Sequence, residues 1–328
     1  AGKISIMTIT LEQHNSIPSI QDIDSIENWI MIFSNPLKRK KFPYQEQILN
    51  RYNKLGQKSK TGFPVVIDLP NKNLSHISFA MLDSDICSFD LLTLARKLVS
   101  AHLSTNPKKI GIFVFGFSKK ESERVAEAII SAALAASATM PVFKSKKQTS
   151  SSFEKIILFG LHTRHGFKQS FAVAEGNALT RSLSILPSNK LTPTHYLKKI
   201  KEVAKENKWK LEFYDEATLR RKKAGAFLAV SQGSPKADAG IVRLRYTPKR
   251  AAKSKKVFLV GKGICYDTGG TNLKPANYMF GMHEDMQGSA VALGTLLALT
   301  KLNFNRPVEC WMALAMNHIG PKAYKPND

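Results

Sequence analysis

The protein has 328 residues, of which 43% are hydrophobic, and 49 Lys and Arg against 25 Asp and Glu give it a net charge of +24. This length suggests about two domains, and the hydrophobic content is enough to bury their cores, which excludes a disordered chain. Three cysteines are too few for a disulfide framework and indicate a reducing compartment. No apolar run reaches roughly 18 residues, so we expect no membrane-spanning segment.

The first half of the chain predicts strands separated by a long helix. Ile110–Phe115 and Ile156–Phe159 are compact apolar runs of strand length. The Ala-rich stretch Ala126–Val142 indicates a buried helix. Ser118 and Glu121 form a capping box that opens this helix, because the serine accepts a bond from an orphan amide and the glutamate reaches back.

The second half continues the alternation. Thr192 is a natural N-cap and Pro193 suits the first helical position, which predicts a helix that runs to about Glu206. Val257–Val260 and Val308–Met316 follow as apolar strands. Continuous apolar strands are typical of sheets that are covered on both faces, and their alternation with helices predicts an α/β architecture.

We expect two domains with a boundary in the polar segment Lys144–Ser152. A small N-terminal α/β domain would span 1–150, and a connecting segment with a helix would span 151–185. A C-terminal mixed-sheet α/β peptidase domain, incomplete in this chain, would span 186–328. The peptidase assignment rests on the resemblance described below.

The positive charge is concentrated in residues 101–250, where 28 basic side chains stand against 11 acidic ones. Short basic clusters occur at Pro36–Lys41, Arg220–Lys223 and Lys249–Arg250. Such an excess would suit nucleic acid or another anionic partner, and it would equally suit a solvated, lysine-rich surface. In residues 261–328 the basic excess almost disappears.

The candidate site residues lie in the glycine-rich stretch Val260–Pro275 and in Met282–Gly288, which follows it. We expect a buried strand to end at Val260 and to lead into a loop with four glycines, which let the backbone approach a ligand closely. A helix should start near Asp285. Carboxylates flanked by lysines could hold a cation or an anion, or they could form salt bridges only. Catalytic loops of α/β sheets lie at the carboxyl ends of strands.

The stretch Lys-Gly-Ile-Cys-Tyr-Asp-Thr-Gly-Gly-Thr-Asn-Leu-Lys-Pro resembles the metal-binding loop of leucyl aminopeptidases, the cytosol aminopeptidase family of dinuclear metallopeptidases. The spacing to Asp285 and the Gly-Ser-Ala after it fit the same pattern. So do Leu186–Pro193 and Ala315–Asp328. The resemblance covers the chain from about residue 170 to its end.

The resemblance implies a role for four residues. Asp267 would bridge two divalent metal ions, which would be zinc or manganese, or else magnesium. Lys262 would bind one of them as a neutral amine, and Asp285 would bind the same ion. Lys274 would stay protonated as the catalytic residue that stabilises the oxyanion of the tetrahedral intermediate. His283 has no counterpart in the family pattern, so we expect it to be a lining or surface residue.

The chain departs from the family in several places. The family's remaining acidic ligands lie in an Asn-Thr-Asp-Ala-Glu-Gly-Arg motif, which we expect beyond Asp328. Met316 stands where a glutamate commonly precedes the asparagine, and Pro326-Asn327 replaces Pro-Gly. Without the remaining ligands the 328-residue chain alone should be inactive. The sequence would then be part of a full-length enzyme, a fragment, or a short paralogue that has lost catalysis.

The leading hypothesis is a metallo-aminopeptidase that releases N-terminal, leucine-like residues from peptides by two-metal hydrolysis. The resemblance also implies a homohexamer. The alternative hypothesis is an inactive paralogue that serves as a basic scaffold or binds nucleic acid. We expect a cytoplasmic protein without membrane association, because no secretion signal is present; a mitochondrial matrix protein is the alternative, since the high pI and the methionine-free start would suit it.

Overall fold

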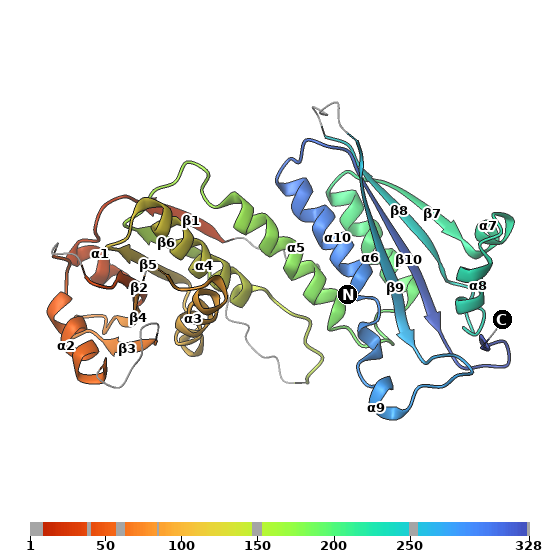
Figure 1. Cartoon of the computed structure of the whole chain (residues 1–328), viewed down its shortest axis with the longest axis horizontal. Helices are drawn as coiled ribbons and strands as arrows, with labels where there is room; N and C mark the ends of the chain where they lie inside the picture. The colour runs from red at the N-terminus through yellow and green to blue at the C-terminus, as the bar shows by residue number, and fades with distance from the viewer. Residues whose placement is uncertain are drawn as a thin grey trace. The chain divides into compact units, whose positions relative to one another are not determined.

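The computed structural model describes residues 9–37, 41–56, 63–83, 85–145, 153–248 and 255–326. The chain divides into two compact units (Figure 1). The N-terminal unit consists of Ser5–Thr139 and Lys144–Phe171, and the C-terminal unit consists mainly of Ala172–Asp328. The division falls inside helix α5 (Lys168–Ser184).

The N-terminal unit is built on a six-stranded sheet with the order β1-β6-β5-β2-β4-β3. Neighbouring strands are parallel, except that β3 runs antiparallel to β4 at one edge. The strands are β1 (Thr10–His14), β2 (Asn28–Ser34), β3 (Val65–Asp68), β4 (His76–Leu82), β5 (Lys109–Phe115) and β6 (Lys155–Phe159). The helices are α1 (Ile20–Ser25), α2 (Gln45–Gly56), α3 (Ser88–Ser100), α4 (Lys119–Ser137) and the 3₁₀ turn Leu103–Thr105.

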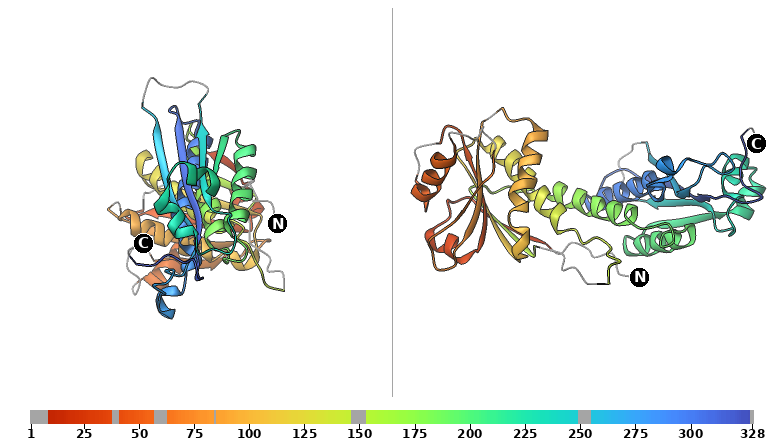
Figure 2. Two further views of the ribbon diagram at one scale, coloured as in Figure 1. Left: turned by 90° about the vertical axis from the view of Figure 1, so that its right-hand side faces the viewer. Right: turned by 90° about the horizontal axis from the view of Figure 1, so that it is seen from below.

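This sheet lies between two helical layers, with α1 and α2 on one side and α3 and α4 on the other (Figure 2). The central strand β2 is therefore apolar on both faces. Trp29, Met31 and Phe33 belong to the core cluster that also contains residues of α1 and α2. Ile30 and Ile32 alternate with them and are also buried. The continuous apolar pattern predicted for such strands is confirmed in this unit.

The C-terminal unit has a four-stranded mixed sheet with the order β7-β8-β10-β9. β7 and β10 run antiparallel to β8, whereas β9 and β10 are parallel. The strands are β7 (Lys210–Asp215), β8 (Gly240–Tyr246), β9 (Val257–Asp267) and β10 (Val308–Asn317). The helices are the rest of α5, then α6 (Pro193–Glu206), α7 (Glu216–Arg221), α8 (Gly225–Ser231), α9 (Ala276–Met279), the 3₁₀ turn Met282–Glu284 and α10 (Gln287–Lys301).

The two faces of this sheet differ in character. One face carries Val242, Leu244 and Met312, which are buried in a core with residues of α5, α6 and α10. The opposite face alternates with the first and carries charged and aromatic side chains. On this second face Phe258 and Val260 of β9 are 59% and 80% exposed. The expectation that these strands are covered on both faces is therefore wrong for β9.

The two-domain α/β class and the mixed C-terminal sheet are confirmed. The capping box is also confirmed, because Ser118 accepts a bond from the Glu121 amide and Glu121 accepts one from the Ser118 amide. Thr192 caps α6, which ends at Glu206 as predicted. The predicted strand end at Val260 is wrong, since β9 continues through the first two glycines to Asp267.

Several predicted features fall outside the described residues in whole or in part. They are most of the polar segment 144–152, the Lys249–Arg250 pair, three residues of the cluster 36–41 and the last two residues of the chain. In the part of the chain that the structure describes, no helix is long and apolar enough to cross a membrane.

Candidate active site

Asp267 stands at the carboxyl end of β9, directly beside Asn317 at the carboxyl end of β10. The register pairs Lys262 with Ala313 and Asp267 with Asn317. Between these two pairs the chain advances by five residues in β9 but by four residues in β10. The extra residue is a β-bulge. Side chains alternate along a strand, so Lys262 and Asp267 would point to opposite faces without the bulge. With it, both lie on the face opposite the hydrophobic core.

Three donors hold the Asp267 carboxylate. Lys274 Nζ donates to Oδ2 at 2.6 Å, while the Gly269 amide and Asn317 Nδ2 donate to Oδ1 at 3.0 and 2.8 Å. Burial by itself raises the pKa of the Asp267 carboxyl, but the hydrogen bonds from Lys274, Gly269 and Asn317 outweigh it. The net pKa lies below its ordinary value, so Asp267 is an anion at neutral pH.

The loop after β9 brings Lys274 back to Asp267. Gly269 and Gly270 have φ angles of +87° and +69°. Residues with a side chain rarely adopt this backbone conformation, so the turn requires glycine. The Lys274 amide then donates to the Thr268 carbonyl at 3.0 Å and closes the loop. The Lys274 ammonium also lies 3.1 Å from the Met282 sulfur. The Lys274 amine is thus fixed beside a partly buried carboxylate.

A second carboxylate–lysine pair forms between Lys262 and Asp285. Lys262 Nζ donates to Asp285 Oδ1 at 2.8 Å. Asp285 follows the 3₁₀ turn Met282–Glu284 and precedes α10, whose first turn presses against β9. A Cβ on Gly261 would stand 2.5 Å from the Ser289 backbone, so only glycine permits this approach. The close contact of helix and strand is what brings Asp285 within reach of Lys262.

The donor set partly fits a divalent cation. The Asp285 Oδ2 atom is buried without a hydrogen bond, although it lies 2.8 Å from Lys262 Nζ. Two carboxylates and one amine are ligands that a hard or borderline divalent ion accepts. Such ions take about four to six ligands, and the described residues contain no group of three or more His, Cys, Asp or Glu arranged for a metal. These residues therefore supply part of a coordination shell.

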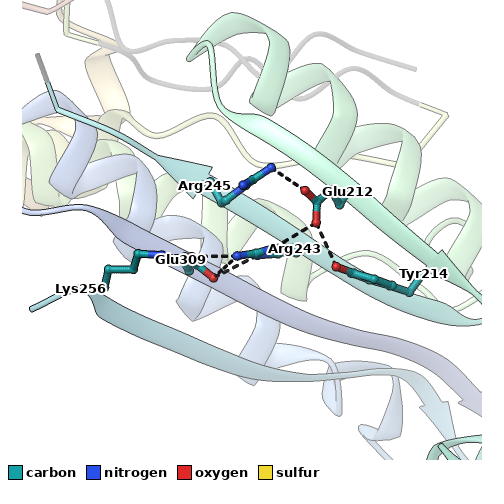
Figure 3. A network of polar contacts seen from close by, with 6 residues as sticks. All are labelled: Glu212, Tyr214, Arg243, Arg245, Lys256 and Glu309. Carbon is teal, nitrogen blue, oxygen red and sulfur yellow. Dashed lines mark hydrogen bonds and ion pairs between the residues drawn. The ribbon is translucent and has the colours of Figure 1, made fainter. Parts of the chain in front are cut away.

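A network of charged side chains lies on the face of the C-terminal sheet opposite the hydrophobic core (Figure 3). Arg243 donates to Glu309 at 3.0 and 2.9 Å and to Glu212 at 3.2 Å, and Lys256 donates to Glu309 at 2.8 Å. Arg243 also lies 5.0 Å above the ring of Trp311. Hydrogen bonds from Arg243 and Lys256 lower the pKa of Glu309 to about 2. These groups neutralise one another, so the network is structural and binds the strands together.

The structure places the four predicted site residues in two pairs, Lys274 with Asp267 and Lys262 with Asp285. It adds Asn317, to which the sequence analysis assigned no role. Asn317 meets Asp267 only through the strand register, fifty positions away in the chain, so no local pattern reveals it.

Two further side chains near the loop have no evident part in the site. The side chain of His283 is about one-third exposed, and its nearest carboxylate partner is Glu284 at 3.9 Å. Cys265 is buried in the core, and this burial raises the pKa of its thiol, so it remains protonated. The position of His283 agrees with the expected lining or surface role, and the burial of Cys265 indicates that it packs in the core.

Solved structures share this fold. The leucyl aminopeptidase of Trypanosoma cruzi superposes on 98% of this chain with a TM-score of 0.76 at 23% identity, which covers 65% of that protein. A bottromycin maturation enzyme, BotP, in complex with Mn covers 92% of this chain and 62% of its own length, with a TM-score of 0.72 at 21% identity. The chain therefore has the two-domain α/β architecture found in leucyl aminopeptidases.

Sequence comparison finds relatives of the second half of the chain. Residues 178–328 match the model of the cytosol aminopeptidase family, catalytic domain. A probable cytosol aminopeptidase of Corynebacterium diphtheriae is 37% identical over 189 residues, which are 56% of this chain and 37% of that protein. Residues 178–328 are therefore similar to the catalytic domain of the cytosol aminopeptidase family, and the sequence match spans little more than a third of that curated relative's length.

Proposed function

We propose that this protein is a metallo-aminopeptidase that releases N-terminal, leucine-like residues from peptides with the help of two divalent cations. The observation that carries the proposal is the ionised Asp267 carboxylate held by Lys274 at 2.6 Å, together with Lys262, which lies on the same strand as Asp267 and pairs with Asp285. All four residues lie inside the range matched by the family model. Zinc or manganese is the proposed metal, and the manganese complex of BotP supports the latter.

Each residue has a proposed task. Asp267, Asp285 and a neutral Lys262 would hold the cations, which, when bound, supply Lewis acidity and a hydroxide nucleophile. Lys274 is held in position by its contact with Asp267. Its ammonium is a donor that can bind the oxyanion that develops when the peptide carbonyl is attacked. The half-buried position of Lys274 strengthens that interaction, because fewer waters compete for the charge.

Hydrolysis of leucyl amide by the intact protein tests this proposal, with Mn²⁺ present and after its removal by a chelator. We expect activity only with the metal. Lys274→Met should lower kcat by roughly 10² to 10³, the usual cost of losing one oxyanion donor. Lys301→Met is the matched control, since Lys301 also pairs with a carboxylate, that of Glu175, but away from the loop. No hydrolysis by the metal-loaded protein, or equal rates for both variants, contradicts the proposal.

Location and assembly are part of the same proposal. A cytoplasmic protein is supported by the relatives, which are named cytosol aminopeptidases. The homohexamer stays a prediction, and sedimentation equilibrium of the intact protein measures it. The alternative hypothesis, an inactive basic scaffold or nucleic-acid-binding protein, receives no support from the comparisons.

A further inference from the structure

Asn317 is the last residue of β10 and is held firmly at its backbone. Its carbonyl accepts two bonds from Thr268, one from the amide at 3.0 Å and one from the hydroxyl at 3.0 Å. Because Thr268 follows Asp267 directly, these bonds tie the end of β10 to the start of the glycine-rich loop. The side chain of Asn317 therefore starts from a defined position beside Asp267.

The side-chain amide of Asn317 has one orientation that fits. Its Nδ2 donates to Asp267 Oδ1 at 2.8 Å. The reverse orientation would set the amide oxygen against a carboxylate oxygen, two acceptors without a proton between them. Its own Oδ1 is buried and accepts no hydrogen bond within the described part of the chain. In the orientation that lets Nδ2 donate to Asp267, the amide oxygen is therefore left without a donor among the described residues.

The two oxygens of the Asp267 carboxylate differ in the number of hydrogen bonds that they accept. Oδ1 receives both the Asn317 amide and the Gly269 amide, which use its two lone pairs. Among the described residues, Lys274 alone donates to Oδ2, so this oxygen keeps one lone pair for another ligand. Rotation of the carboxylate would break the bonds from Asn317 and Gly269 together.

We propose that Asn317 is a positioning residue, which locks the Asp267 carboxylate so that Oδ2 faces Lys274 and the ligand of the site. This inference rests on the proposed aminopeptidase function. Asn317 itself touches neither substrate nor reacting atoms; it acts through Asp267. Outer partners of this kind change metal affinity or activity by about 10- to 100-fold when they are replaced.

Two substitutions test the role. Asn317→Leu keeps the size of the side chain and removes the donor, and Asn317→Asp keeps the shape and replaces the donor with an acceptor. Asn207→Leu is the control, because the Asn207 side chain donates to the Val203 carbonyl at the end of α6 and not to the site. If the leucine variant does not fold, the aspartate variant carries the test.

The first measurement requires neither a bound metal nor enzymatic activity. In the intact protein labelled with ¹⁵N-glycine, the Gly269 amide proton reports its hydrogen bond to Asp267. We expect both Asn317 variants to shift this resonance upfield and to speed its exchange roughly tenfold, the effect of losing one such bond. An unchanged Gly269 amide overturns the proposal, whether or not the wild-type protein hydrolyses peptides.

The second readout is hydrolysis of leucyl amide with Mn²⁺. We expect kcat of the Asn317 variants to fall by about 10- to 100-fold with KM little changed, while Asn207→Leu keeps the wild-type rate. A shifted Gly269 amide with unchanged kcat overturns the positioning role. A wild-type protein without activity contradicts the proposed function, and the Gly269 resonance alone then decides whether Asn317 orients Asp267.

Discussion

The buried histidine of the N-terminal unit makes the stability of that unit depend on pH. His102 is fully buried, and its ring nitrogens lie 2.9 Å from Asn28 Oδ1 and 2.9 Å from Ser78 Oγ. In a neutral ring, Nδ1 donates to Asn28 Oδ1 and Nε2 can accept the Ser78 hydroxyl proton, for which the Leu98 carbonyl competes. Burial, and secondarily the nearby charge of His76, lower the pKa of His102 from 6.5 to about 3.

The sign of the effect follows from this shift. The folded form binds the proton less well than the unfolded chain, so the contribution of His102 to stability is complete above pH 6.5 and is lost as the pH falls from 6.5 towards 3. Each pH unit in that window costs about 1.4 kcal/mol. Acidification from about pH 8 to about pH 5 should therefore cost the N-terminal unit about 2 kcal/mol through this residue.

Urea unfolding across this pH range, followed by hydrogen exchange of β2 and β4 peptides, measures the effect in the unit that contains His102. His102→Gln keeps a donor and an acceptor but cannot be protonated, so it should be less stable than the wild type near neutral pH. Its free energy of unfolding should fall by about 2 kcal/mol less on acidification. Parallel pH profiles of the two proteins would refute the reasoning.

Two further predictions concern the C-terminal unit. Gly261→Ala should lower the free energy of unfolding by about 1–3 kcal/mol, because its Cβ would stand 2.5 Å from the Ser289 backbone. Gly225→Ala, with nothing within 4 Å, should cost nothing in the same urea titration, and equal losses would contradict the packing argument. Glu309→Gln should destabilise by roughly 3 kcal/mol at neutral pH, since it removes the buried carboxylate that Arg243 and Lys256 share and leaves Arg243 with Glu212 alone. The lowered pKa of Glu309 means that its contribution is present above pH 4.5 and is lost towards pH 2, so wild type and variant should converge there in thermal melts; a constant difference would count against the network.

The sequence predicted the features that depend on neighbouring residues. The Ser118 capping box and the Thr192 cap both form as expected, because each joins residues three positions apart. The apolar runs located β5, β6, the start of β9 and most of β10, although they did not reveal the other six strands of the described residues. The glycine-rich loop pointed to Asp267 and Lys274. Each of these is a short-range pattern that the chain carries regardless of its tertiary contacts.

The end of β9 could not be predicted in this way. Gly261 and Gly263 indicate a loop by local preference, yet both lie in the strand. Their lack of side chains serves the first turn of α10, which packs on them and carries Asp285 towards Lys262. The contact with α10 that keeps these glycines in the strand involves residues more than twenty positions later in the chain.

By itself, the sequence determined which residues carry charge in the site and which segments form helices and strands, because those properties are local. Only the tertiary structure decided how the charged residues face one another. The bulge in β9 turns Asp267 onto the face of Lys262, and the register with β10 brings Asn317 to the Asp267 carboxylate. Both depend on the pairing of strands fifty residues apart, where a shift of one position would send a side chain to the opposite face.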